Sequence, residues 1–122
     1  MRHTTSRNVD RLLPLKPDVF EMLLALKGGA RHGYGLLKLL EAREIKLPAS
    51  LLYRKLRRLM DDGWVAESET KPDEETNDAR RRYYRLTPTG EAILRAEAAR
   101  IVELARSGHV RKLAQDAKAD NA

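Results

Sequence analysis

The feature that most constrains this sequence is a basic helical segment that ends in a glycine and is followed at once by two segments of strand character. Pro48 and Ser50 are typical of a helix start, and Gly63 is typical of the residue that follows a helix end. Leucines recur between them at three- and four-residue steps, which predicts one apolar and one polar face. The apolar face holds Leu52, Leu56, Leu59 and Met60, and the opposite face holds Ser50, Arg54, Arg57 and Arg58.

The two following segments, residues 64–69 and 82–86, alternate aromatic or β-branched residues with charged ones. This alternation predicts the two strands of a hairpin. The stretch between them, residues 71–79, is polar and contains Pro72 and the acidic residues Asp73, Glu74, Glu75 and Asp78. Because these carboxylates repel phosphates, we expect the hairpin tip to point away from any nucleic acid.

Two further helices are predicted before the basic segment and one after the hairpin. The first begins at Pro17 and Asp18 and ends at Gly28 and Gly29, and the second runs from Tyr34 to residue 43 or 44. The final helix begins with a Thr87 cap and Pro88, or more loosely at Thr89, and Ser107 and Gly108 are expected to break or kink it. Its apolar stripe holds Ile93, Leu94, Ala98, Ile101, Val102 and Ala105.

Three short helices followed by a hairpin make the order of a winged helix-turn-helix domain. The length of 122 residues suits one such domain with an accessory helix. We therefore expect a mainly α fold with a small β-hairpin and a C-terminal dimerisation helix. The expected parts are a flexible basic N-terminal arm (1–16), the winged helix-turn-helix domain (17–87), the dimerisation helix (88–115) and a disordered tail (116–122).

Composition excludes several function classes. The chain has no cysteine and its three histidines are far apart, so no metal site or thiol chemistry is expected. No nucleophile–base order, carboxylate pair or phosphate loop is present, so we expect no enzyme, no catalytic residue and no cofactor. No stretch resembles a signal peptide or a membrane span, so a cytoplasmic protein without membrane contact is expected. The formal net charge of +6 favours a nucleic-acid partner.

The basic residues fall where a winged helix would meet DNA. An α-helix fits the major groove of B-DNA, where exposed polar side chains reach base edges and arginines hold phosphates. The run Arg80-Arg81-Arg82 begins the second wing strand and is expected to contact phosphates or the minor groove. The apolar stripe of the last helix is expected to form a homodimer seam, since its alternating charges argue against a membrane face.

Four motifs in this order resemble the PadR-like family of winged helix-turn-helix transcriptional regulators. They are His32-Gly33-Tyr34-Gly35, the segment from Leu51 to Leu59, Asp62-Gly63-Trp64-Val65, and the segment from Arg82 to Gly90. The resemblance covers roughly residues 18–105 and implies a repressor that dimerises through its C-terminal helix and often responds to a small aromatic or lipophilic effector. It also implies that Tyr34, Ser50, Tyr53, Arg57, Arg81 and Arg82 lie near DNA, although the sequence leaves open whether Tyr34 and Tyr53 pack in the core instead.

The expected function is therefore sequence-specific regulation by a homodimer on a palindromic double-stranded operator, with a small-molecule effector near the dimer seam. Two alternatives remain open from the sequence. One is an adaptor that keeps the scaffold but binds a protein through the terminal helix, and the other is a nonspecific architectural DNA binder.

Overall fold

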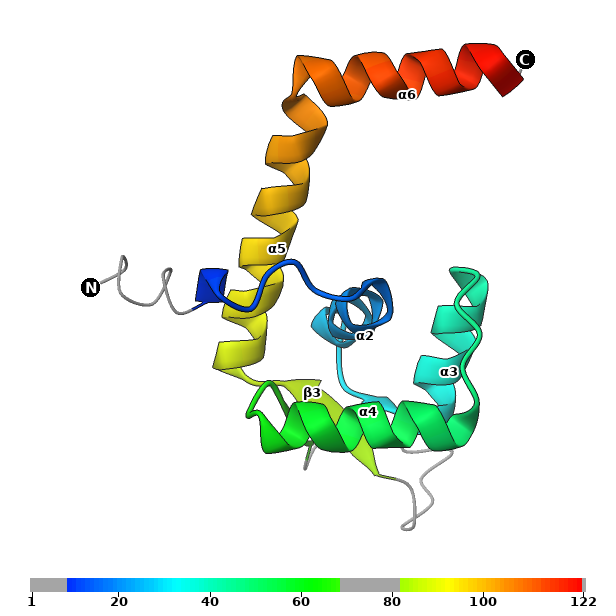
Figure 1. Cartoon of the computed structure of the whole chain (residues 1–122). Coiled ribbons are helices and arrows are strands. Elements are labelled where there is room, and N and C mark those ends of the chain that lie inside the picture. The colour runs from blue at the N-terminus through cyan, green and yellow to red at the C-terminus, as the bar shows by residue number, and fades with distance from the viewer. Residues whose placement is uncertain (1–8, 69–81, 122) are drawn as a thin grey trace.

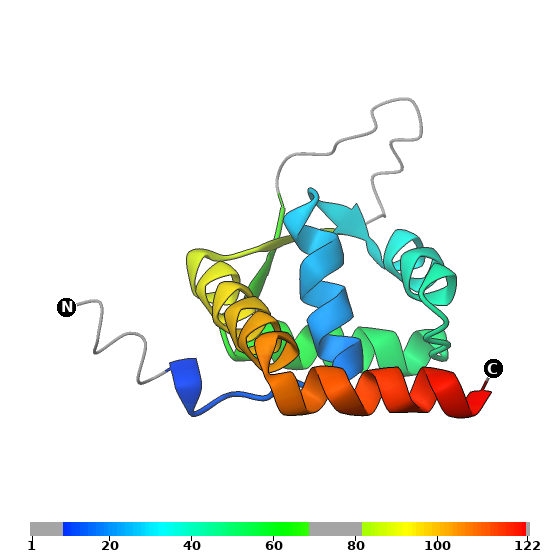
Figure 2. The same cartoon turned by 90° about the horizontal axis from the view of Figure 1, so that it is seen from above.

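The computed structural model describes residues 9–68 and 82–121, and within them it is mostly helical with one small sheet. Helix α2 lies between α5 and α3, and α4 and α6 lie at opposite ends of α5 (Figures 1 and 2). This arrangement is a winged helix with an additional C-terminal helix. In chain order the elements are α2 (Pro17–Lys27), β1 (Arg31–His32), α3 (Gly33–Ala42), α4 (Ala49–Asp61), β2 (Val65–Glu67), β3 (Tyr83–Leu86), α5 (Pro88–Arg106) and α6 (Gly108–Asn121).

The basic segment forms α4 and ends as its sequence predicts. Gly63 has φ +80°, a conformation that favours glycine. The Gly63 N–H donates to the Met60 carbonyl, and the Trp64 N–H donates back to the Leu59 carbonyl at 2.9 Å. These two bonds form a Schellman motif, which closes the helix and turns the chain directly into β2.

The predicted hairpin is confirmed and gains a third strand. The sheet order is β1-β3-β2 with both pairings antiparallel, and Val65 opposes Leu86 while His32 opposes Tyr83. The short β1 strand was not predicted, because Arg31 and His32 carry neither the alternation nor the residue types of a strand. Its pairing fixes the start of α3 against the base of the wing.

One hydrophobic core joins the helices to the sheet. Met22, Leu36, Leu52 and Ile93 come from α2, α3, α4 and α5, and each has a relative exposure of 0%. Val65 of β2 and Tyr84 of β3 close the same cluster on the sheet side. Because each helix buries one apolar stripe here, the opposite face of α4 is held outward.

The start of α5 explains the Thr87-Pro88-Thr89-Gly90 segment. The Thr87 hydroxyl accepts a hydrogen bond from the Gly90 N–H at 3.0 Å and donates to the Gly63 carbonyl at 2.6 Å, so Thr87 is the cap of the helix, as predicted. A Cβ on Gly90 would lie 2.0 Å from the Trp64 carbonyl oxygen. Only glycine therefore allows the start of α5 to lie this close to the backbone of Trp64, in the turn that leads into β2.

Two predicted segments, the N-terminal arm and the C-terminal tail, differ from the structure. Within the arm expected over residues 1–16, Val9 is buried and the Leu15 N–H donates to Glu97 of α5, so residues 9–16 are packed rather than flexible; residues 1–8 lie outside the described chain. The helix expected over 88–115 breaks at Ser107, where the sequence predicted a break or kink, and a second helix follows it. The tail expected to be disordered is helical to Asn121, because Ala117, Lys118 and Ala119 are strong helix formers, although none is buried.

Candidate nucleic-acid interface

The outward face of α4 is the centre of the candidate site. Leu52, Leu56 and Leu59 are buried against the core, which directs the opposite side of the helix to solvent. Ser50, Arg54 and Arg57 lie on that side and are exposed. The helix forms one edge of the molecule, away from α6 (Figure 1). A straight, basic helix that protrudes in this way has the shape and charge to enter a major groove.

The cations of α4 differ in whether they already have partners. Among the described residues, Arg54 and Arg57 form no ion pair. Lys55 pairs instead with Asp18 at 2.9 Å, with both side chains 20% exposed. Burial would raise the pKa of the Asp18 carboxyl, but the hydrogen bond and charge of Lys55 outweigh it and hold that pKa below its ordinary value. Lys55 therefore fixes α4 to α2, while Arg54 and Arg57 remain available to a ligand.

Arg58 lies at the edge of this face. Its Nε is 3.4 Å from the Asp62 carboxylate, one turn later, and its side chain is 80% exposed. Such an exposed pair is worth little in water and is readily exchanged for another anion. Arg58 can thus reach a phosphate at the flank of α4.

Tyr34 and Tyr53 are both exposed, at 58% and 47%, so the structure places neither in the core. Tyr34 stands at the start of α3 with its ring stacked on His32 at 6.4 Å and with the Lys38 ammonium 5.3 Å from the ring centre. Hydrogen bonds to Tyr34 and then to Glu41 raise the pKa of Lys38. Lys38 was missed in the sequence, although its place one turn after Tyr34 puts both on one helix face.

The histidine and glycine before Tyr34 set its position. His32 caps α3, with its Nδ1 accepting from the Gly35 N–H at 3.0 Å, as a residue at the helix entry is expected to do. A Cβ on Gly33 would lie 2.3 Å from the Tyr53 hydroxyl oxygen. The glycine therefore lets α3 approach α4 closely enough for Tyr34 and Tyr53 to border the same basic face.

The wing is described only in part. Arg82 is exposed and lies 3.5 Å from Glu67 across the two wing strands. Arg80 and Arg81 lie outside the described residues, as do Asp73, Glu74, Glu75 and Asp78 of the predicted tip. The predicted contacts of Arg80 and Arg81 and the direction of the tip therefore stay predictions.

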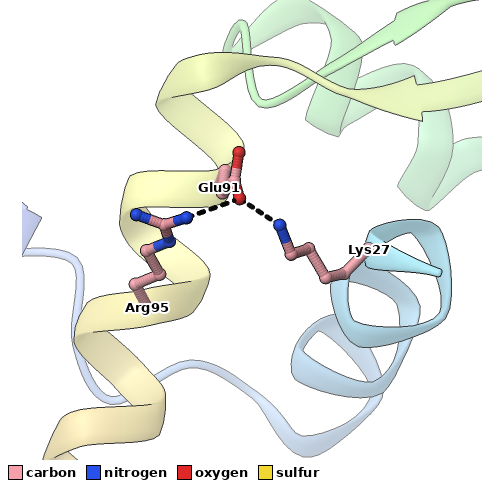
Figure 3. Close-up of polar contacts among 3 residues, drawn as sticks. All are labelled: Lys27, Glu91 and Arg95. Carbon is pink, nitrogen blue, oxygen red and sulfur yellow. Dashed lines mark hydrogen bonds and ion pairs between the residues drawn. The ribbon is translucent and has the colours of Figure 1, made fainter. Parts of the chain in front are cut away.

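A polar cluster joins α5 to α2, on which α4 is held by the ion pair between Lys55 and Asp18. Glu91 pairs with Lys27 of α2, and one of its oxygens also lies 3.0 Å from the Arg95 guanidinium (Figure 3). Its two cationic partners, with Lys27 the stronger, hold the pKa of Glu91 below its ordinary value. All three groups are substantially exposed, so the cluster orients the helices more than it stabilises them.

The predicted dimer seam needs a correction at two positions. Ile93 and Leu94 are 0% and 4% exposed inside the protomer's own core, so they are not available to a partner. Ala98, Ile101, Val102 and Ala105 are exposed, as expected for a seam. The apolar stripe is thus divided, since its first part covers α2 and the sheet while its second part extends beyond the core. Apolar side chains missed by the prediction, at Leu104, Val110 and Leu113, continue the exposed part onto α6.

The described residues offer neither a candidate metal site nor a helix suited to span a membrane. No group of His, Asp or Glu side chains in residues 9–68 and 82–121 could hold a metal ion. No helix in the described part of the chain is long and apolar enough to cross a membrane.

The fold and the protruding basic helix define a winged helix-turn-helix protein. The transcriptional regulator PadR-like family matches residues 22–96, more than half of the chain. The chain therefore belongs to the PadR-like family, which is a family of transcriptional regulators and not of enzymes.

One solved PadR family regulator agrees with this assignment, and two other solved structures share the fold. A PadR family transcriptional regulator from Eggerthella lenta is 30% identical, with 75% of this chain and 79% of that one aligned and a TM-score of 0.56. RosR of H. salinarum is 23% identical over 90% of this chain and 96% of its own, with a TM-score of 0.59. PadR of Bacillus subtilis, solved with operator DNA, is 21% identical over 67% of this chain and 45% of its own, with a TM-score of 0.53. No curated protein sequence matches the chain.

Proposed function

We propose that this regulator is a cytoplasmic repressor that binds a palindromic operator as a homodimer, with α4 in the major groove. The observation that carries the proposal is the pair of exposed arginines, Arg54 and Arg57, which have no ion-pair partner among the described residues. An exposed guanidinium is well hydrated without a carboxylate partner, so these two arginines can bind an anion without first giving up an ion pair with a described residue. Guanidinium groups so placed suit the O6 and N7 acceptors of guanine and the phosphates beside them.

Other residues supply the contacts that set the register of the protein on DNA. Tyr34, Tyr53 and Arg58 are all exposed, and we assign them to phosphate contacts beside the arginine face. Arg82 extends the positive surface toward the wing, where we also propose contacts from Arg80 and Arg81. Phosphate contacts position a protein and base contacts give specificity, so we assign readout to Ser50, Arg54 and Arg57. The operator complex of the related B. subtilis PadR supports a DNA-binding role.

The proposed dimer is a second copy of this chain packed on the exposed part of the stripe. Ile101, Val102 and Leu104 of α5 continue into Val110 and Leu113 of α6, and each is between 39% and 68% exposed. These exposed apolar side chains lie on the second half of α5 and on α6, at the end of α5 opposite to α4 (Figure 1). A two-fold seam there leaves both α4 helices free to enter successive major grooves, about 34 Å apart.

The DNA-binding part is tested by a salt titration with the intact protein and a duplex taken from upstream of its own gene. Each phosphate neutralised by a cation releases counterions, so log K falls with log salt by about 0.9 for each contact. With several arginines engaged, we expect affinity to fall by at least tenfold between low and moderate salt. Affinity that stays flat over that range would contradict the proposal, and equal affinity for random DNA at fixed salt would indicate an architectural binder instead.

The dimer is tested by Ile101→Glu combined with Leu113→Glu, two exposed positions whose replacement leaves the core intact. Charges buried in the seam should give monomers with unchanged helical circular dichroism and weak binding to the palindrome. The control is Leu39→Glu, which places one such charge on α3 at a leucine with nearly the exposure of Ile101. A parent chain that sediments as a monomer at micromolar concentration would refute the dimer and favour the adaptor alternative.

A further inference from the structure

A hollow of about 380 Å³ lies between the segment that precedes α2 and the flank of α4. Its apolar lining comes from Leu12, Leu15, Val19, Leu59 and Trp64. These residues belong to the N-terminal segment, α2, α4 and the turn into β2, so the hollow exists only in the folded chain. Its size is within the range of small-molecule sites in proteins.

The charges of the hollow are predominantly positive. Lys16, Lys55 and Arg58 line it together with one carboxylate, that of Asp62. Lys55 is held by Asp18 at 2.9 Å, whereas Lys16 forms no ion pair within the described chain and Arg58 has only the exposed pair with Asp62 at 3.4 Å. Two cations with at most weak partners therefore stand beside an apolar lining.

We propose that this hollow binds an amphiphilic carboxylate, with its apolar body against Trp64 and the leucines and its carboxylate between Lys16 and Arg58. A neutral apolar molecule would form no charge-assisted hydrogen bond with Lys16 or Arg58. A small inorganic anion would leave the apolar side chains of the hollow in contact with water. The site is on the flank of α4 and separate from the exposed stripe of α5 and α6, where an effector was expected from the sequence.

The hollow shares Arg58 with the proposed DNA interface. A carboxylate that binds Arg58 withdraws a cation from the phosphates and adds a negative charge beside α4. Binding of the carboxylate and binding of DNA then oppose each other. The ligand should lower the affinity for DNA, and DNA should lower the affinity for the ligand by the same factor. This coupling rests on the proposed function, whereas the binding of the carboxylate does not.

The ligand site is tested without DNA. Trp64 is the only tryptophan of the chain and lines the hollow, so its fluorescence reports occupancy. Octanoate and 1-octanol are optically silent and differ mainly in the charge of the head group. We expect octanoate to shift the Trp64 emission in a saturable manner and to bind about tenfold more tightly than octanol.

The variants distinguish this site from others. Lys16→Gln and Arg58→Gln should each weaken octanoate about three- to tenfold and leave octanol unchanged, because only the charged head group meets them. Leu12→Glu, at an exposed position of the rim, should abolish binding by repulsion. Arg95→Gln, on α5, is the matched control and should bind like the parent.

Equal affinity for octanoate and octanol, an absence of saturation, or no effect of Lys16→Gln would overturn the proposal. So would loss of octanoate binding in the Ile101→Glu, Leu113→Glu variant, because that result places the ligand at the seam. For the coupling, saturating octanoate should reduce DNA affinity several-fold in the parent and leave it unchanged in Leu12→Glu. Failure of this last result alone would refute the competition and leave the binding site standing.

Discussion

Replacement of Glu97 by alanine should destabilise the fold more than any change at an exposed charge of α5. Glu97 is 1% exposed, and one of its carboxylate oxygens accepts from the Leu15 N–H at 2.7 Å. The other oxygen is paired with the Arg100 guanidinium, whose side chain is 36% exposed. The carboxylate thus holds the N-terminal segment on α5, and with it one wall of the hollow beside α4.

The magnitude follows from these contacts. A hydrogen bond to a charged group contributes about 1.5–3 kcal/mol, and a buried N–H left without a partner costs about 1–3 kcal/mol. Arg100 can turn to water, so its lost pair adds little. We therefore expect Glu97→Ala to lower the free energy of unfolding by about 2–3 kcal/mol. Glu97→Gln keeps an acceptor for Leu15 and should lower it by about 1 kcal/mol.

The assay is urea unfolding of the parent and both variants at one protein concentration, because dimerisation contributes to apparent stability. Arg100 is the chief cause, with the Leu15 N–H in support, of a Glu97 pKa below its ordinary value of 4.5. A lowered folded-state pKa means that the stabilisation is present above about 4.5 and is lost as the pH falls through the folded-state value. The difference between parent and Glu97→Gln should therefore be constant near neutrality and shrink below pH 4.5. A loss under 0.5 kcal/mol for Glu97→Ala, or a difference that does not change with pH, would show that the Glu97 carboxylate does not hold the N-terminal segment.

Two further substitutions test the packing at the start of α5 and the proposed DNA contact of Tyr34. Gly90→Ala should destabilise the folded protein by about 1–3 kcal/mol in thermal unfolding, because the new Cβ meets the Trp64 carbonyl. This loss should exceed the gain from the higher helix propensity of alanine. A stabilised variant would contradict the close approach of Gly90 to Trp64. Tyr34→Phe should lower the affinity for operator and random DNA about equally, by two- to fivefold in anisotropy titrations, because it removes one phosphate donor and no base contact. A loss of affinity for the operator alone would reassign Tyr34 to base readout.

Much of this fold could be predicted from the sequence, because many of its turns, caps and helix faces are determined by residues that are close together in the chain. The Gly63 turn, the Thr87 cap and the outward face of α4 each depend on residues within one or two helical turns. The exposed arginines follow from the same helical period, so the centre of the candidate site could be predicted.

Other features depend on contacts between distant residues, and the sequence could not give them. A helical apolar stripe has the same period whether it is covered by its own chain or by a partner, so Ile93 and Leu94 were assigned to the wrong surface. Glu97 is buried only because Leu15 and Arg100 satisfy it, and the partner in the N-terminal segment is 82 residues away. β1 has only two residues and exists because β3 lies beside it.

We propose that α4 reads DNA through Arg54 and Arg57, which form no ion pair with any described residue. The most direct measurement is the ratio of operator to random-duplex affinity at one salt concentration for the parent, Arg57→Ala and Arg95→Ala, with Arg95 as an exposed arginine of α5 that has a carboxylate partner. We predict that Arg57→Ala lowers operator affinity about tenfold or more and random-duplex affinity much less, while Arg95→Ala changes neither. Equal losses on both duplexes for Arg57→Ala, or no loss at all, would contradict the assignment of α4 as the recognition helix.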